Sequence, residues 1–247
     1  MKKLLPARLK QLLWFIFKAP QRKFVGFDTL ATEVKAYVSL AAKSNKLKPV
    51  SICTGLKNRS QNYLDYVLKS ISVAEHSELI ELCVFDCGSD DMPDLVVEIR
   101  KIWKGSLIFQ SVPGVFSRSH TFNKAVELST NDIIFICDAD ISLPADIVKR
   151  INKNVTDKAA WFPIINSIEK DGTEKPFRSG AGIFASLKES FVKAGLYDES
   201  FKTWGHEDWL LYFEFYKNDI AALRTFEPGI KHHWHPSLKP EDFKPLF

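Results

Sequence analysis

An apolar run that ends in two acids decides the expected fold: Ile133-Ile134-Phe135-Ile136-Cys137 is followed at once by Asp138-Ala139-Asp140. Five consecutive apolar residues bounded by polar ones predict a buried strand. Side chains alternate along a strand, so Asp138 and Asp140 are expected to point the same way. Paired carboxylates suit Mg²⁺ or Mn²⁺ bridging to a phosphate. Alone, this pattern is weak evidence for a metal site, because it arises often by chance and is also compatible with a solvated strand end or a helix cap.

Similar apolar runs precede this one and alternate with helical patterns. Further strands are expected at Val50–Thr54, Ile80–Phe85 and Ser106–Ser111, and helices near residues 61–73, 92–103, 120–129 and 144–154. This alternation predicts βαβ units, and hence an α/β fold with a mostly parallel central sheet flanked by helices. After residue 158 we expect an apolar stretch at 161–168, a strand near 183–185 and a helix at about 207–217.

Composition excludes several classes of protein. The 247 residues are 45% hydrophobic and 26% charged, with only 11 Gly and 12 Pro, so the chain can build a core and is neither collagen-like nor disordered. No run of 18 apolar residues is present, as a membrane-spanning helix would need. The cysteines form no C-x-x-C pair and are expected to be free and buried, as in a cytoplasmic protein: Cys53, Cys83, Cys87 and Cys137.

The net charge of +4 is unevenly distributed. Residues 1–49 hold 11 basic and 2 acidic residues, whereas the remainder is acidic overall. Residues 1–24 carry no acid and repeat leucines at helical spacing, which predicts a basic amphipathic helix, and a second helix is expected at 29–43. We therefore divide the chain into an arm at 1–48 and a domain at 49–247. The arm suits peripheral attachment to an anionic membrane, or docking on the body or a second subunit; nucleic acid is not an expected partner.

Polar clusters follow the predicted strands, at the sheet edge where open α/β sheets bind ligands. Two further motifs carry chemistry. Trp204-Gly205-His206-Glu207-Asp208-Trp209 places adjacent acids between aromatic rings, which is typical of sugar sites and of a general base, although acids also favour the first turn of a helix. His232-His233-Trp234-His235 offers three histidines. One of them would complete an Mg²⁺ or Mn²⁺ site; the alternative is a surface histidine whose hydrogen bonds are satisfied without a metal.

The order of these motifs resembles family 2-type glycosyltransferases of the GT-A fold, in the branch of bacterial chondroitin polymerase and the animal β-1,4-galactosyltransferases. The resemblance spans about residues 50–236. It implies metal-dependent transfer of a sugar, with inversion, from a UDP-sugar to a hydroxyl of a glycan or lipid-linked oligosaccharide. Bacterial lipopolysaccharide or capsule synthesis, at the cytoplasmic face of the inner membrane, is the expected setting. A retaining transferase and a non-catalytic nucleotide-binding, sugar-binding or membrane scaffold protein are the alternatives.

The resemblance also implies roles for individual residues. Asp208 would be the general base, and Glu207 would orient the acceptor. Nucleotide-sugar binding would fall to Thr54, Asn58, Arg59, Asp86, Ser89, Arg118, Asn123, Asp138 and Ala139. Acceptor binding would fall to Arg178, Gly180, Trp204, Gly205, His206 and Glu207, and metal binding to Asp138, Asp140 and His235. Two departures stand out: His206 replaces the second glycine of Trp-Gly-Gly-Glu-Asp, and His232 and His233 compete with His235 as ligands.

Overall fold

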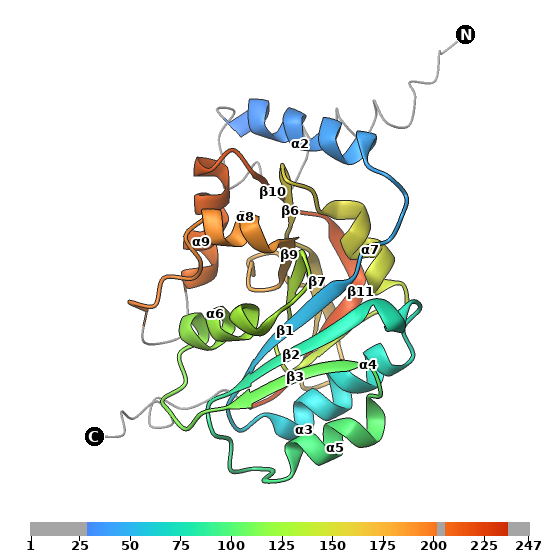
Figure 1. The fold of residues 1–247 in the computed structure, drawn as a ribbon, viewed down its shortest axis with the longest axis vertical. Coiled ribbons are helices and arrows are strands. Elements are labelled where there is room, and N and C mark those ends of the chain that lie inside the picture. The colour runs from blue at the N-terminus through green and yellow to red at the C-terminus, as the bar shows by residue number, and fades with distance from the viewer. Residues whose placement is uncertain (1–28, 202–205, 237–247) are drawn as a thin grey trace.

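The computed structural model describes residues 29–201 and 206–236. The predicted basic helix at 1–24 and the predicted acceptor residues Trp204 and Gly205 lie outside these ranges. In the described part, eleven strands form two sheets (Figure 1). No helix in this part is both long enough and apolar enough to cross a bilayer.

The larger sheet has seven strands in the order β10-β6-β9-β4-β1-β2-β3. Its central strands run parallel, and β9 is antiparallel to its neighbours β4 and β6. The expected α/β fold with a mostly parallel central sheet is therefore confirmed. Its strands, in chain order, are β1 (Val50–Leu56), β2 (Ile80–Asp86), β3 (Ser106–Ser111), β4 (Ile133–Ile136), β6 (Ala159–Trp161), β9 (Phe184–Leu187) and β10 (Ala221–Leu223).

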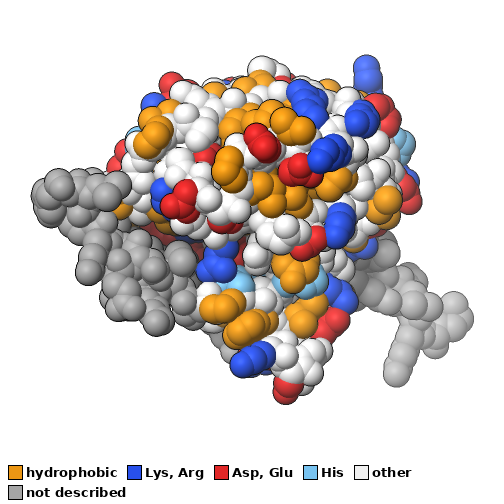
Figure 2. Space-filling view, turned by 90° about the horizontal axis from the view of Figure 1, so that it is seen from below, with side chains coloured by type: hydrophobic (Ala, Val, Ile, Leu, Met, Phe, Trp, Pro, Cys, Tyr) orange, Lys and Arg blue, Asp and Glu red, His pale blue; other side chains and the backbone are white. Residues whose placement is uncertain are grey.

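Helices cover both faces of this sheet. The chain order is α2 (Leu30–Ala42), α3 (Ser60–Asn62), the π-helical η3 (Tyr63–Leu68), α4 (Lys69–Ser72), the 3₁₀ turn η4 (Ser77–Leu79), α5 (Leu95–Ile102), α6 (Arg118–Leu128), α7 (Ile147–Asn154), α8 (Lys188–Lys193) and α9 (Glu207–Lys217). On the face seen in Figure 2, charged side chains of both signs are interspersed with hydrophobic ones.

Strand alternation separates two cores, one on each face of the sheet. In β4, Ile133 and Phe135 pack with residues of η3, α4, α5 and α7, whereas Ile134 and Ile136 pack with residues of α6, α8 and α9. A strand buried on both faces must be apolar at every position, which is why its sequence is a continuous run. The polar residues that follow it leave the core at the carboxyl edge of the sheet.

A second, four-stranded sheet was not expected from the sequence. It has the order β5-β11-β7-β8, with β5 (Ile141–Ser142), β7 (Ile164–Ile168), β8 (Glu174–Pro176) and β11 (Phe226–His233). The apolar stretch at 161–168 is divided, because its first residue ends β6 in the large sheet while β7 belongs to the second. The strand β11 brings His232 beside Ile141 of β5, directly after the Asp138–Asp140 turn.

Helix α2 packs on the β10–β6 edge of the large sheet. Ala36 lies against Ala159, Ala221 and Leu223, and Lys35 forms an ion pair with Asp219 at 2.9 Å. The second helix of the predicted arm thus contacts the domain directly, and the proposed division near residue 48 stays a prediction.

Candidate active site

Asp140 lies at the centre of a potential metal site. Its Oδ2 accepts a hydrogen bond from His235 Nε2 at 2.8 Å, and His232 Nε2 lies 3.6 Å from its Oδ1. One ligand atom from each of these three residues lies within 4.8 Å of the others. Burial alone would raise the pKa of Asp140, but the hydrogen bond from His235 and the charge of His232 outweigh it and lower that pKa. The same bond raises the pKa of His235.

The neighbouring His233 points to a different environment. Its Nε2 is hydrogen-bonded to Ser142 Oγ at 2.8 Å, and its ring stacks on Tyr66 at 3.8 Å between centroids. Alternation along β11 explains why His232 and His233 face opposite ways. Of the three histidines that the sequence offered, His232 and His235 therefore converge on Asp140.

Asp138, which we predict as a metal ligand beside Asp140, contacts Arg118, and its role at a metal stays a prediction. The Arg118 Nη2 atom lies 3.2 Å from Asp138 Oδ1, and Nη1 lies 3.4 Å from Glu207 Oε1. Nη1 also donates to Tyr197 Oη at 3.3 Å, and Nη2 to the Gly182 carbonyl at 2.8 Å. One guanidinium thus joins the acid at the end of β4 to the first acid of α9.

Electrostatics around this bridge follow from burial. The side chains of Arg118 and Glu207 are 6% and 2% exposed, and that of Asp138 is 34% exposed. Burial raises the pKa of Asp138, Arg118 opposes this rise, and Asp140 adds to it. Burial also disfavours the charged form of Arg118, but its acidic partners raise its pKa well above the ordinary value. Arg118 is therefore a permanent cation between two carboxylates.

Asp208 is half-buried beside the Arg178–Gly182 segment. Its Oδ2 accepts a hydrogen bond from the Ala181 backbone N–H at 3.1 Å, and its Oδ1 from the N–H of Trp209 at 2.8 Å. Trp209 Nε1 donates to the Ser179 carbonyl at 2.9 Å. Backbone donors thus orient the carboxylate, as a residue that takes a proton at a fixed position requires.

His206 precedes these acids with φ of 73°, in the left-handed region, and is the N-cap of α9. Glycine adopts this conformation without the steric cost that a Cβ brings. The departure from Trp-Gly-Gly-Glu-Asp therefore places an exposed histidine where the backbone favours glycine.

The predicted nucleotide residues gather at the ends of β1 and β2. Asp86 accepts hydrogen bonds from the Ser89 backbone N–H at 3.0 Å and from Ser111 Oγ at 2.6 Å. Asn58 Oδ1 accepts from Asp90 N–H at 3.0 Å, which ties the two loops together. Arg59 Nη2 donates to the Pro236 carbonyl at 3.0 Å, next to His235.

The other predicted binding residues differ in burial and in their contacts. Thr54 is buried in β1, and its hydroxyl has no hydrogen-bond partner among the described residues. Asn123 holds the 197–199 loop, because its amide donates to the Tyr197 carbonyl and to Glu199 Oε1, each at 2.9 Å. Ala139 is buried between the two acids, and the side chain of Arg178 is exposed.

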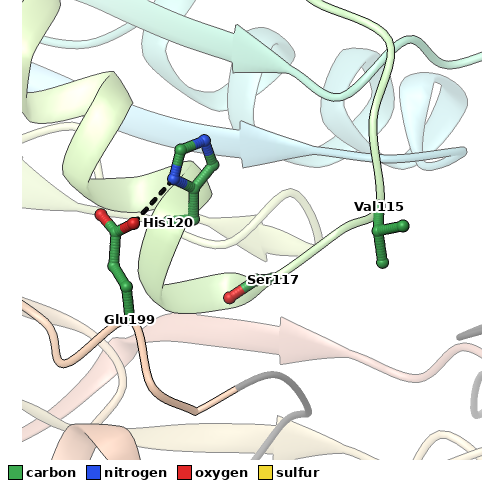
Figure 3. A pocket seen from close by; sticks show the side chains of 4 residues that line it. All are labelled: Val115, Ser117, His120 and Glu199. Carbon is green, nitrogen blue, oxygen red and sulfur yellow. Dashed lines mark hydrogen bonds and ion pairs between the residues drawn. The ribbon is translucent and has the colours of Figure 1, made fainter. Parts of the chain in front are cut away.

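A cavity of about 220 Å³ lies at the N-terminal end of α6. Val115, Ser117, His120 and Glu199 line it, and Figure 3 shows the His120 ring turned toward the Glu199 carboxylate, with Nδ1 and Oε2 2.8 Å apart. None of these four residues is among the catalytic, binding or metal-binding residues that the sequence predicts. The acids Asp138, Asp140, Glu207 and Asp208 do not line this cavity.

Two residues of the site were missed by sequence reasoning. His232 was treated only as a competitor of His235, although its position in β11 follows from pairing with β5. Arg224, fully buried after β10, donates to the carbonyls of Arg178 at 3.1 Å and Gly180 at 2.7 Å. Arg224 directly follows the apolar run Ala221-Ala222-Leu223. Since a charged side chain is rarely buried unless it is paired, this position could have predicted a buried arginine with specific partners.

Comparison with known proteins shows the family of the chain and its fold. The model of the glycosyl transferase family 2 matches residues 51–210, and the chain belongs to this family. Its fold is that of the GT-A glycosyltransferases. The predicted class of enzyme, a glycosyltransferase, is therefore confirmed.

Curated relatives are much longer than this chain. Chondroitin sulfate synthase 3 of Mus musculus is 28% identical over 187 residues, which cover 64% of this chain and 21% of that protein. The N-acetyl-beta-glucosaminyl-glycoprotein 4-beta-N-acetylgalactosaminyltransferase 1 of Mus musculus is 24% identical over 192 residues, which cover 73% of this chain and 18% of that protein. The chain thus spans about a fifth of the length of these relatives.

Solved structures share the fold at low sequence identity. S. aureus TarS 1-349 in complex with UDP-GlcNAc has a TM-score of 0.61 at 14% identity, covering 79% of this chain and 63% of that chain. The mannosyltransferase PcManGT from Pyrobaculum calidifontis in complex with GDP-Man and Mn²⁺ has a TM-score of 0.57 at 15% identity, and the match covers 94% of this chain and 68% of that chain.

Proposed function

We propose that this protein transfers a sugar from a UDP-sugar to a hydroxyl of a glycan or glycolipid acceptor, with inversion and with a divalent cation. The observation that carries the proposal is the bridge made by Arg118. It joins Asp138, two residues before the Asp140–histidine cluster, to Glu207, the residue before Asp208. A donor-side cluster and an acceptor-side base thus lie on either side of one buried cation.

The residues around Asp140 fit a divalent cation. Asp140 Oδ1 is buried and has no hydrogen-bond partner in the described part of the chain, and His232 Nε2 lies 3.6 Å from it. A buried carboxylate oxygen without a hydrogen bond is costly unless a cation satisfies it. Carboxylate oxygen together with imidazole nitrogen suits Mn²⁺ better than Mg²⁺, which prefers oxygen alone. Asp140, His232 and His235 would hold the ion, and its charge would neutralise the diphosphate of the leaving UDP.

The proton transfer is assigned to Asp208. The acceptor oxygen attacks the anomeric carbon while the bond from that carbon to the β-phosphate oxygen breaks, and the electron pair leaves with UDP. The Asp208 carboxylate takes the hydroxyl proton, since the N–H groups of Ala181 and Trp209 hold it in place. Glu207 sets the acceptor side of the site through its ion pair with Arg118.

Setting and partners are proposed from the charge pattern of the sequence. The basic residues at 1–24 would attach the enzyme peripherally to an anionic membrane, at the cytoplasmic face of a bacterial inner membrane. A lipid-linked oligosaccharide of lipopolysaccharide or capsule synthesis is the matching acceptor. Four buried free cysteines are compatible with a reducing compartment.

A screen of UDP-sugars tests the function directly. Release of UDP from each donor is measured with Mn²⁺, with Mg²⁺ and with EDTA, for the wild type and for D140N. We expect metal-dependent release with one donor class and its loss in D140N. Release that persists in EDTA, or equal release by D140N, would contradict the proposed metal site. The absence of release with every donor would favour a binding protein.

A further inference from the structure

The Arg178–Gly182 segment is held through its backbone by side chains of α6 and α9 and by Arg224, which follows β10. Asp208 and Trp209 of α9 bind the Ala181 N–H and the Ser179 carbonyl, and Arg118 of α6 binds the Gly182 carbonyl. Gly182 permits this approach, because a Cβ there would lie 3.0 Å from Arg118 Nη2. The position of this segment is therefore set by the residues of the site.

Arg224 supplies the remaining contacts to the segment. Its Nη2 donates to the carbonyls of Arg178 at 3.1 Å and Gly180 at 2.7 Å, and its side chain is fully buried. Its Cζ lies 5.2 Å from the centre of the Trp209 ring, within cation–π range. One guanidinium thus contacts both the segment and the residue that follows Asp208.

The Gly180 carbonyl and the Ala181 N–H belong to the same peptide group. That group is planar, so its carbonyl and N–H point in opposite directions and rotate together. Arg224 fixes the carbonyl end, while the N–H end donates to Asp208 Oδ2. A cation on the carbonyl also polarises the peptide and strengthens its N–H as a donor.

We propose that Arg224 is a positioning residue for the general base: through the Gly180–Ala181 peptide and the Trp209 ring it sets the orientation of the Asp208 carboxylate. The inference rests on the proposed role of Asp208 in sugar transfer. A buried guanidinium costs several kcal/mol to desolvate, and an apolar side chain of similar length would fill the same space at lower cost. An apolar side chain would not supply the charged, planar hydrogen-bond donor group that the guanidinium presents to the backbone carbonyls.

The test compares R224M and R224K with the wild type, and with R150M as a matched control. Arg150 pairs with Asp146 and Glu227 on the far side of the sheet from α6 and α9, so R150M should not change transfer. In R224M we expect kcat to fall by about 100-fold, the size of effect that a misplaced catalytic group causes. The dissociation constant and stoichiometry of UDP, measured by calorimetry, should not change. R224K, which keeps the charge, should recover part of kcat.

Hydrogen exchange gives a readout that needs no activity. The Ala181 amide should exchange at least about 10-fold faster in R224M, because the peptide is no longer held against Asp208. Unchanged exchange, or unchanged kcat, would overturn the inference. Equal losses of kcat and of UDP stoichiometry would show a merely structural role and would also overturn it. Should R224M not fold, R224K is used in its place: we expect it to lower kcat and to speed Ala181 exchange by less than the values given for R224M, and unchanged kcat or unchanged exchange would overturn the inference. A wild type that transfers no sugar refutes the proposed function, and Ala181 exchange then decides on Arg224 alone.

Discussion

Replacing Arg118 by methionine tests the buried bridge of the site. Methionine keeps an apolar contact with Phe122 but removes the charge between Asp138 and Glu207. Glu207 is 2% exposed, so it would remain a buried anion without its guanidinium, which costs about 3–5 kcal/mol. Asp138 is 34% exposed, so solvent screens it and its loss adds no more than about 1 kcal/mol.

We therefore expect R118M to lower the free energy of unfolding by about 4 kcal/mol, out of roughly 5–15 kcal/mol for a typical domain. In urea denaturation followed by tryptophan fluorescence, the midpoint should fall by about 1.5 M, for a slope of about 2–3 kcal/mol per M. The double variant R118M/E207Q should recover about 2 kcal/mol, because it removes the buried negative charge of Glu207 as well.

The matched control is R150M on α7, whose ion pairs are more exposed and should cost less than about 1 kcal/mol. The bridge would be refuted by an R118M variant as stable as R150M. A double variant less stable than R118M would refute it equally, because no buried charge would then have been relieved.

Three further predictions follow from single positions. H206G should raise the free energy of unfolding by about 1 kcal/mol, measured by urea denaturation, because position 206 has φ of 73°; a loss of stability would contradict this. G182A should destabilise by at least about 1 kcal/mol in the same assay, because its Cβ would lie 3.0 Å from Arg118 Nη2, and an unchanged midpoint would contradict that close approach. In calorimetric titration with Mn²⁺, H235A should weaken binding by about 10-fold or more, whereas H233A should leave it unchanged; equal effects would place the ion elsewhere.

The sequence alone was sufficient to predict those strands, helices and acidic residues that are determined by a local pattern of residues. The run at 133–137 gave the strand β4, and strict alternation of apolar runs with helical patterns gave the parallel sheet. The acids Asp138, Asp140, Glu207 and Asp208 were found because each follows a buried strand or begins a helix. These features depend on neighbours in the chain, and so they are visible without a structure.

What the sequence did not predict depends on distant pairing. The strand β5 has two residues and β11 mixes charged, proline and histidine residues, so neither carries a strand pattern of its own. Their pairing is nevertheless what brings His232 to Asp140. In the same way, Asp138 contacts Arg118 because a buried guanidinium from α6 reaches it, and no spacing in the sequence encodes that contact.

The anomeric configuration of the transferred sugar tests the central claim most directly. Proton NMR of the product that the wild type forms from an α-linked UDP-sugar in Mn²⁺ should show a β-linkage, and D208N should form almost no product while still binding UDP. An α-linked product would contradict the single displacement, and near-full transfer by D208N would contradict the assignment of Asp208 as the base.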